Sequence, residues 1–183
     1  MMKDFPLNRV FTLIEPGPVL LVATANGRKK NIMTISWSTV LDFDARFAIV
    51  TGPWNYSFQA LMKSRECVVA IPSADLMEKT VDIGACSGDT ENKFQKFSLT
   101  PLKAEKVKAP LIAECPINIE CRVLDYLESC GIVVLSALKA WRDPQKRGRI
   151  RFFHAVGDGT FIMDGEHVTE LRSHMLSKLP PGI

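Results

Sequence analysis

The chain has 183 residues, 46% of them hydrophobic and 23% charged, and its net charge is +3 at pH 7. These values fit one domain over residues 1–183 and exclude a disordered, collagenous or repeat protein. A positive charge this small tolerates an anionic ligand but argues against nucleic acid as a partner.

The first half of the chain predicts four strands and two short helices. The strands fall at 19–25, 31–40, 46–52 and 66–72. Asn26-Gly27 is a strong turn signal between the first two strands. From Ser57 onward, apolar residues recur at helical spacing, which predicts a short amphipathic helix. A second helix is predicted over 74–84, with Ser73 as its N-cap.

The second half of the chain predicts a hairpin and one or two further short strands. Residues 117–127 alternate apolar with polar side chains, and 131–141 follow across a short turn. Further short strands are predicted within 149–165. Six or seven strands with short helices between them, joined mostly by hairpin-length turns, predict a mainly β fold, an antiparallel barrel or sandwich.

The five cysteines form no C-x-x-C pair, which argues against a disulfide framework and against structural zinc. We therefore expect reduced thiols and a cytoplasmic protein. The apolar run VLLVATA, 19–25, is too short for a membrane span, which needs about 20 residues. The three histidines lack the close spacing of metal ligands, so we expect no metal and no membrane association.

The stretch NIMTISWSTV, Asn31–Val40, alternates almost without interruption. On an extended chain, one side carries Met33, Ile35 and Trp37, and the other carries Thr34, Ser36 and Ser38. The apolar side predicts burial. The hydroxyl side is either the solvent-exposed face of an edge strand or a face that lines a ligand-binding site.

A second polar stretch begins where a strand ends at Gly52-Pro53 and a helix starts near Asn55 to Ser57. The first turn of a helix leaves backbone N–H groups unpaired, and the helix dipole favours negative charge there. With nearby side-chain donors, this end is a candidate phosphate site. The alternative, which is commoner, is simple capping of the helix by Asn or Ser.

A third polar stretch, CSGDTENKF, offers backbone amides at Ser87 and Gly88 and the charge of Lys93. The alternative is a solvated loop that runs into a helix at Asp89. Three polar stretches beside apolar strands together suit a planar ligand with a phosphate tail.

Four segments carry a resemblance to a known family. PGPVLLVAT…NIMTISWST, NYSFQALMKSRECVVAIP, GACSGDTENKF and ECPINIECRV occur in the order and spacing of the flavin reductase-like family. The resemblance is greatest to flavoredoxin-type members and covers about 11–161. It implies an antiparallel FMN-binding split β-barrel and a homodimer that binds FMN non-covalently near the subunit interface.

The resemblance also implies which residues hold the cofactor. They are Asn31, Met33, Thr34, Ser36, Trp37, Ser38 and Thr39 along the strand, Asn55, Tyr56 and Ser57 at the helix start, and Ser87, Lys93 and Phe94 after the loop. Many relatives carry Arg where this chain has Asn55, and Asp where it has Asn92. Losing the cation weakens the phosphate site, which leaves two alternatives: a neutral ligand bound in place of FMN, or compensation by Lys93.

The function expected from these features is electron transfer through FMN, from NAD(P)H or a protein donor to an acceptor. The flavin supplies the redox chemistry, so no catalytic side chain is nominated. His154 is either an ordinary strand histidine or a neighbour of the nicotinamide or of the electron partner. The alternative from another class is a split-barrel module that binds a ligand, or nucleic acid through the basic cluster Lys139–Arg151, without redox turnover.

Overall fold

The computed structural model describes residues 2–144, 150–165 and 167–175. Its main sheet has eight strands, all paired antiparallel, in the order β3-β2-β6-β9-β10-β5-β4, with β1 added on β10. The strands are β1 (Lys3–Phe5), β2 (Leu20–Asn26), β3 (Lys29–Ile35), β4 (Ser38–Val40), β5 (Arg46–Val50), β6 (Glu66–Ile71), β9 (Ile117–Leu127) and β10 (Ile132–Arg142). The expected mainly β, split-barrel class is confirmed.

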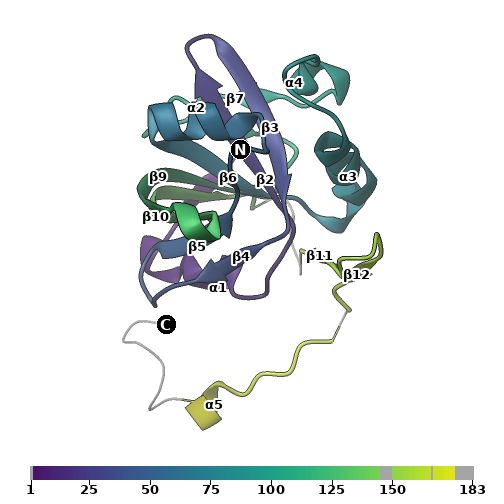
Figure 1. Ribbon diagram of the computed structural model, residues 1–183. Coiled ribbons are helices and arrows are strands. Elements are labelled where there is room, and N and C mark those ends of the chain that lie inside the picture. Colours follow the sequence, from purple (N-terminus) through teal and green to yellow (C-terminus); the bar gives the residue numbers. More distant parts are fainter. Residues whose placement is uncertain (1, 145–149, 166, 176–183) are drawn as a thin grey trace.

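Small hairpins and short helices surround this sheet (Figure 1). The hairpins pair β7 (Pro101–Leu102) with β8 (Leu111–Ile112), and β11 (Phe153–Ala155) with β12 (Phe161–Met163). The α-helices are α1 (Phe11–Ile14), α2 (Ser57–Ser64), α3 (Met77–Ala85), α4 (Lys93–Lys96) and α5 (Arg172–Met175). Three short 3-10 turns cover Leu7–Arg9, Ala74–Leu76 and Glu128–Cys130.

The central strands β2 and β6 are buried on both faces, which explains their nearly continuous apolar sequences. In β2, Leu20 and Val22 belong to the cluster inside the curled sheet, where α2 also packs. Leu21 and Ala23, on the other face, join a second cluster with Ile83 of α3 and with the segment 94–115. The sheet therefore separates two hydrophobic cores, and α3 and α4 lie outside the barrel (Figure 1).

The predicted strand 31–40 is wrong as one continuous element. The structure ends β3 at Ile35 and begins β4 at Ser38, so two residues connect the opposite ends of the sheet order. The three residue steps from Ile35 to Ser38 span at most about 11 Å, so the sheet must curl until its end strands meet. Trp37 lies at this corner and is 67% exposed, not buried as the alternation predicted.

The helix predicted over 74–84 is confirmed as a 3-10 turn followed by α3, and Ser73 occupies the N-cap position as predicted. Ser73 makes no capping bond to the backbone, and its hydroxyl instead donates to the Asp75 carboxylate. The hairpin of 117–127 with 131–141 is confirmed as β9 and β10.

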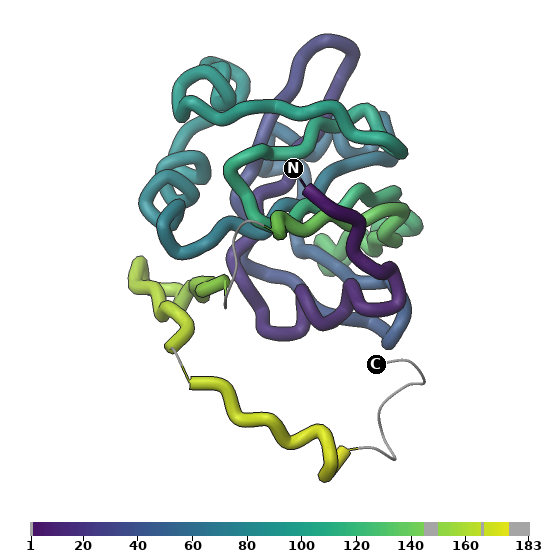
Figure 2. Tube along the Cα trace, turned by 180° about the vertical axis from the view of Figure 1, so that it is seen from behind, coloured from purple at the N-terminus to yellow at the C-terminus, as the bar shows by residue number. Residues whose placement is uncertain are grey.

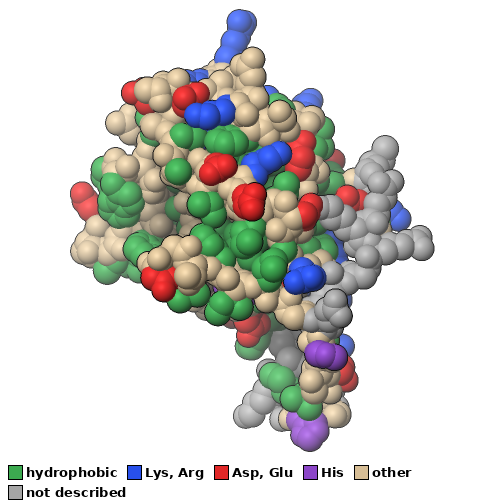
Figure 3. Space-filling model, turned by 90° about the vertical axis from the view of Figure 1, so that its right-hand side faces the viewer, with side chains coloured by type: hydrophobic (Ala, Val, Ile, Leu, Met, Phe, Trp, Pro, Cys, Tyr) green, Lys and Arg blue, Asp and Glu red, His purple; other side chains and the backbone are tan. Residues whose placement is uncertain are grey.

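Residues 167–175 lie outside the barrel as an extended arm (Figure 2). Its exposed apolar side chains include Val168, Leu171 and Met175. Figure 3 shows hydrophobic side chains at the lower end of this arm, beyond the body of the molecule. Among the described residues, no helix is long and apolar enough to cross a membrane.

Candidate functional site

A cavity of about 260 Å³ opens where β3, the start of α2 and the end of α3 meet. It is lined by Asn31, Met33, Thr34, Trp54, Asn55, Tyr56, Ser57, Gly84, Ala85, Cys86, Ser87, Gly88 and Lys93. A second cavity of about 170 Å³ shares Thr34, Trp54 and Asn55 with the first and extends it to Ser36 and Trp37. The two form one elongated site along the end of β3 and the corner that follows it.

Asn31 is the central polar residue of the cavity wall contributed by β3. Only 6% of this residue is exposed, and its Nδ2 donates to Ser57 Oγ at 2.9 Å. Asn31 Oδ1 has no hydrogen-bond partner among the described residues. A buried acceptor without a partner costs about 1–3 kcal/mol, so a ligand that donates to it recovers that energy.

The start of α2 is not capped by Asn55 or Ser57, so the capping interpretation is wrong. The N-cap position is Tyr56, and it makes no side-chain capping bond. Asn55 Nδ2 instead donates to Thr51 Oγ1 at 3.0 Å, at the end of β5. Ser57, only 1% exposed, faces Asn31 across the cavity wall.

The third polar stretch is largely an exposed loop, in which Gly88 is the one buried residue between Ser87 and Asn92. The helix predicted to begin at Asp89 begins instead at Lys93. The Asn92 side chain caps this helix, α4, by accepting from Gln95 N at 3.3 Å. Lys93 is 4% exposed, and its Nζ donates to Ile83 O at 2.7 Å, near the C-terminus of α3. Burial lowers the pKa of Lys93 below its ordinary value, against a smaller opposing effect from Cys86.

The loop after α3 approaches the cavity so closely that one position requires glycine. A Cβ on Gly88 would stand 2.1 Å from Asn31 Oδ1 and 2.2 Å from Asn31 Nδ2. Glycine therefore lets the loop backbone lie directly against the Asn31 amide. Gly88 was noted in the sequence for its backbone amide, but its packing against a residue 57 positions earlier gives no local signal.

The structure brings eight of the thirteen expected residues into the first cavity. These are Asn31, Met33, Thr34, Asn55, Tyr56, Ser57, Ser87 and Lys93. Ser36 and Trp37 line the second cavity. Thr34 Oγ1, on the cavity wall, donates to Thr80 O at 2.7 Å.

Three of the expected residues line neither cavity. Ser38 and Thr39 lie in β4, beyond the corner, where the hydroxyl face of β3 does not continue. Phe94 lines a separate groove on the other side of the 88–94 loop. Trp54, 67% exposed, and half-buried Cys86 line the first cavity but were not in the expected set.

His154 lies in β11, where it makes structural contacts, and it lines neither cavity. Its Nδ1 lies 3.0 Å from Gly17 O, and its Nε2 lies 3.0 Å from Asp164 Oδ1. These contacts join the β11–β12 hairpin to the turn before β2. The ordinary strand histidine is therefore the interpretation that the geometry favours.

We expect His154→Phe to lower the free energy of unfolding by about 1 kcal/mol, because it removes both hydrogen bonds from a partly exposed site. Urea unfolding measures this, and His174→Phe on exposed α5 is the control. Equal stabilities of His154→Phe and the control would contradict the structural assignment. FMN binding should not change in either variant.

The basic cluster Lys139–Arg151 falls partly outside the described residues, at 145–149. Lys139 itself is engaged within the protein. Its Nζ lies 2.7 Å from Glu105 Oε2 and 3.2 Å from Asp4 Oδ1. In the described part of the chain, no group of three or more His, Cys, Asp or Glu residues could hold a metal ion.

Comparisons with solved structures show the fold. The FMN-binding domain of a flavin reductases-like enzyme from Shewanella baltica superposes with a TM-score of 0.82 at 20% identity, over 93% of this chain and 97% of that one. The flavoredoxin of Desulfovibrio vulgaris (Miyazaki F) gives a TM-score of 0.76 at 22% identity, over 86% and 91%.

Comparisons of sequence show the family. An uncharacterized protein of Archaeoglobus fulgidus is 37% identical over 102 residues, which are 55% of this chain and 58% of that protein, so the match spans less than two thirds of this relative. The family model "Flavin reductase like domain" matches residues 14–157. The chain therefore belongs to the flavin reductase-like domain family.

Proposed function

We propose that this chain binds FMN non-covalently in the elongated cavity and works as an oxidoreductase that transfers electrons. The observation that carries the proposal is the convergence of Asn31, Ser57, Gly88 and Lys93, from three separate segments, on one cavity. Structures similar to this one include an FMN-binding domain and a flavoredoxin, which supports a flavin as the ligand.

The residues present fit a phosphorylated flavin. The Lys93 ammonium and the Ser57 hydroxyl are donors suited to a phosphate. Asn31 Oδ1, buried without a partner, suits a ribityl hydroxyl that donates a hydrogen bond. The second cavity, between Trp37 and Trp54, suits a flat ring system.

The bound flavin would supply the electron chemistry, and the protein would supply binding, orientation and electrostatics. Neither cavity is lined by a histidine or a carboxylate. We therefore assign no catalytic acid or base. The side chains at the site position the ligand, and the ring pocket beside Ser36 and Trp37 is left open to a partner.

We further propose a homodimer with the site near the subunit interface. Trp37 and Trp54, each 67% exposed, stand at the rim of the site, and Phe43 is 52% exposed in the β4–β5 turn. Large exposed apolar side chains around a cavity are typical of interaction surfaces. None of the five cysteines forms a disulfide, which supports the expected reducing compartment, the cytoplasm.

The proposal is tested by titrating the purified protein with FMN and then adding NADH or NADPH without oxygen. We expect stoichiometric FMN binding. Bleaching of the flavin absorbance at about 450 nm by a nicotinamide would identify a reductase. Bleaching only by a reduced protein donor would identify a flavoredoxin-like carrier. Failure to bind FMN would overturn the proposal and leave the non-redox binding module.

A further inference from the structure

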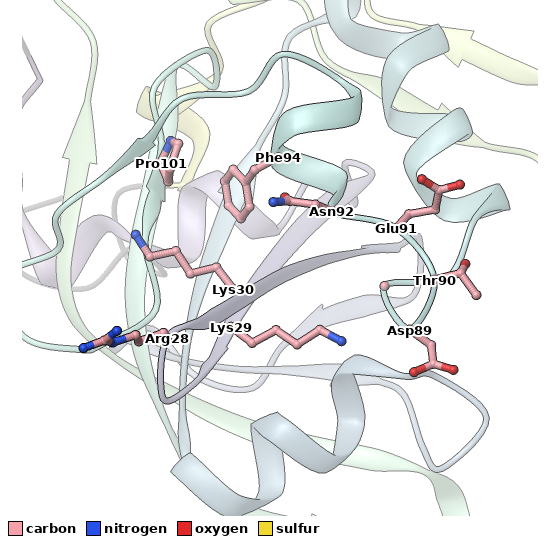
Figure 4. Close-up of a pocket in the computed structure, with 10 residues that line it drawn as sticks. Arg28, Lys29, Lys30, Asp89, Thr90, Glu91, Asn92, Phe94 and Pro101 are labelled. Carbon is pink, nitrogen blue, oxygen red and sulfur yellow. The ribbon is translucent and has the colours of Figure 1, made fainter.

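The tip of the β2–β3 hairpin carries three consecutive cations, Arg28, Lys29 and Lys30, beside the loop that closes the cavity. They line a groove of about 340 Å³ together with Asp89 and Thr90 of that loop. In Figure 4 the Lys29 side chain runs toward the loop, whereas Arg28 and Lys30 point to the opposite side. The hairpin thus directs one of its three charges toward the candidate site.

Strand geometry explains the direction of Lys29. It is the first residue of β3, and side chains two residues apart in a strand share a face. Lys29 therefore shares its face with Asn31, which lines the cavity. Lys30 belongs to the opposite face.

Lys29 reaches the residues that begin α2. Its Nζ donates to Tyr56 OH at 2.7 Å and lies 4.8 Å from the centre of the Tyr56 ring. A small cavity of about 60 Å³ is lined by Lys29, Asn31, Tyr56 and Ser57. The ammonium of Lys29 is thus held beside the hydroxyl and amide groups assigned to the phosphate.

The charge balance of the site calls for this second cation. A phosphate monoester carries a charge of about −1.5 to −2 at pH 7. Lys93 is the cation that lines the first cavity, and one of its N–H bonds is already committed to Ile83 O. Asn55 is neutral. One buried ammonium therefore leaves a bound phosphate incompletely neutralised.

We propose that Lys29 is the second cation of the phosphate subsite and sets the preference of this protein for phosphorylated over unphosphorylated flavin. The inference rests on the proposed function of the cavity. It assigns a binding role to a hairpin residue whose position in the sequence suggests only a solvated turn.

The test compares Lys29→Met with Lys30→Met, which removes the same charge from the same hairpin on the other face. Dissociation constants for FMN and riboflavin are measured by quenching of flavin fluorescence. We expect Lys29→Met to raise the dissociation constant for FMN about five-fold at low ionic strength. This factor corresponds to the upper end of the energies of exposed charge pairs. Riboflavin should bind equally to all variants, and Lys29→Arg should restore FMN binding.

Repeating the titrations at high ionic strength distinguishes the effect of the lost Lys29 charge on FMN binding from the effect of the changed side-chain shape. The loss in Lys29→Met should shrink in about 1 M salt, where the screening length falls to about 3 Å. Equal dissociation constants for FMN in Lys29→Met and Lys30→Met would overturn the inference. So would a loss of riboflavin affinity in Lys29→Met as large as the loss of FMN affinity. If the unaltered protein bound neither flavin, the proposed function itself would fail.

Discussion

Replacing Lys93 by Met should raise the dissociation constant for FMN about ten-fold or more, on the order of 1.4 kcal/mol, and leave riboflavin binding nearly unchanged. Met keeps much of the length of the lysine stem, so the packing of this buried residue is preserved. What is lost is the ammonium in the cavity wall, and a phosphate distinguishes the two flavins. Fluorescence titration with both ligands measures the difference.

Lys96→Met is the matched control, because Lys96 lies on the same helix and is exposed. Its Nζ pairs with Glu91 Oε1 at 3.0 Å and does not line the cavity. This control should bind FMN like the unaltered protein. If Lys93→Met lost as much affinity for riboflavin as for FMN, the lysine would shape the cavity without contacting the phosphate.

The buried position of Lys93 also predicts how FMN binding depends on pH. Burial lowers the pKa of Lys93 below 10.5, so the ammonium loses its proton at a lower pH than an exposed lysine does. FMN affinity should therefore fall as the pH rises through this lowered pKa, while riboflavin affinity stays flat. Lys93→Met should abolish this pH dependence.

The same shift has the opposite effect on the stability of the free protein. Between the lowered pKa and 10.5, the unfolded chain holds the Lys93 proton and the folded chain does not. Stability then rises with pH over that window, relative to Lys93→Met. Binding and stability thus change in opposite directions, as expected for a charge kept in a buried site for a ligand.

Local patterns predicted the strands well because strand burial follows alternation and turn chemistry. The β2–β3 and β9–β10 hairpins fall where Asn26-Gly27 and the apolar alternation place them. The break at Ser36 and Trp37 gave no such signal. It follows from the curl of the whole sheet, which brings β3 and β4 together, and alternation along one strand carries no information about that closure.

The site was predictable as a set of segments but not as a set of contacts. The bond between Asn31 and Ser57 joins residues 26 positions apart, and Lys93 meets Ile83 across a loop. Local chemistry favoured instead the interpretation that Asn55 or Ser57 caps the helix. That interpretation failed because each polar side chain found a partner in another segment, which only the fold brings near.

Gly88→Ala should have the largest effect on the site, an approximately hundred-fold loss of FMN affinity, or about 2.7 kcal/mol. The new Cβ would stand 2.1 Å from Asn31 Oδ1, a distance that forces the Asn31 side chain to move. Moving it breaks the bond to Ser57 and withdraws the unpaired acceptor from the ligand. Titration with FMN measures the loss, and a thermal melt measures the accompanying strain.

A compensating variant decides whether Asn31 transmits this effect. Asn31→Ala removes the atoms that an added Cβ at position 88 would strike, so adding it to Gly88→Ala should restore thermal stability. FMN should still bind weakly, because the amide is gone. Gly165→Ala, where the new Cβ meets nothing within 4 Å, controls for the substitution itself. Normal FMN affinity in Gly88→Ala would mean that the ligand does not depend on the contact between Gly88 and Asn31, and the cavity would no longer be the phosphate site.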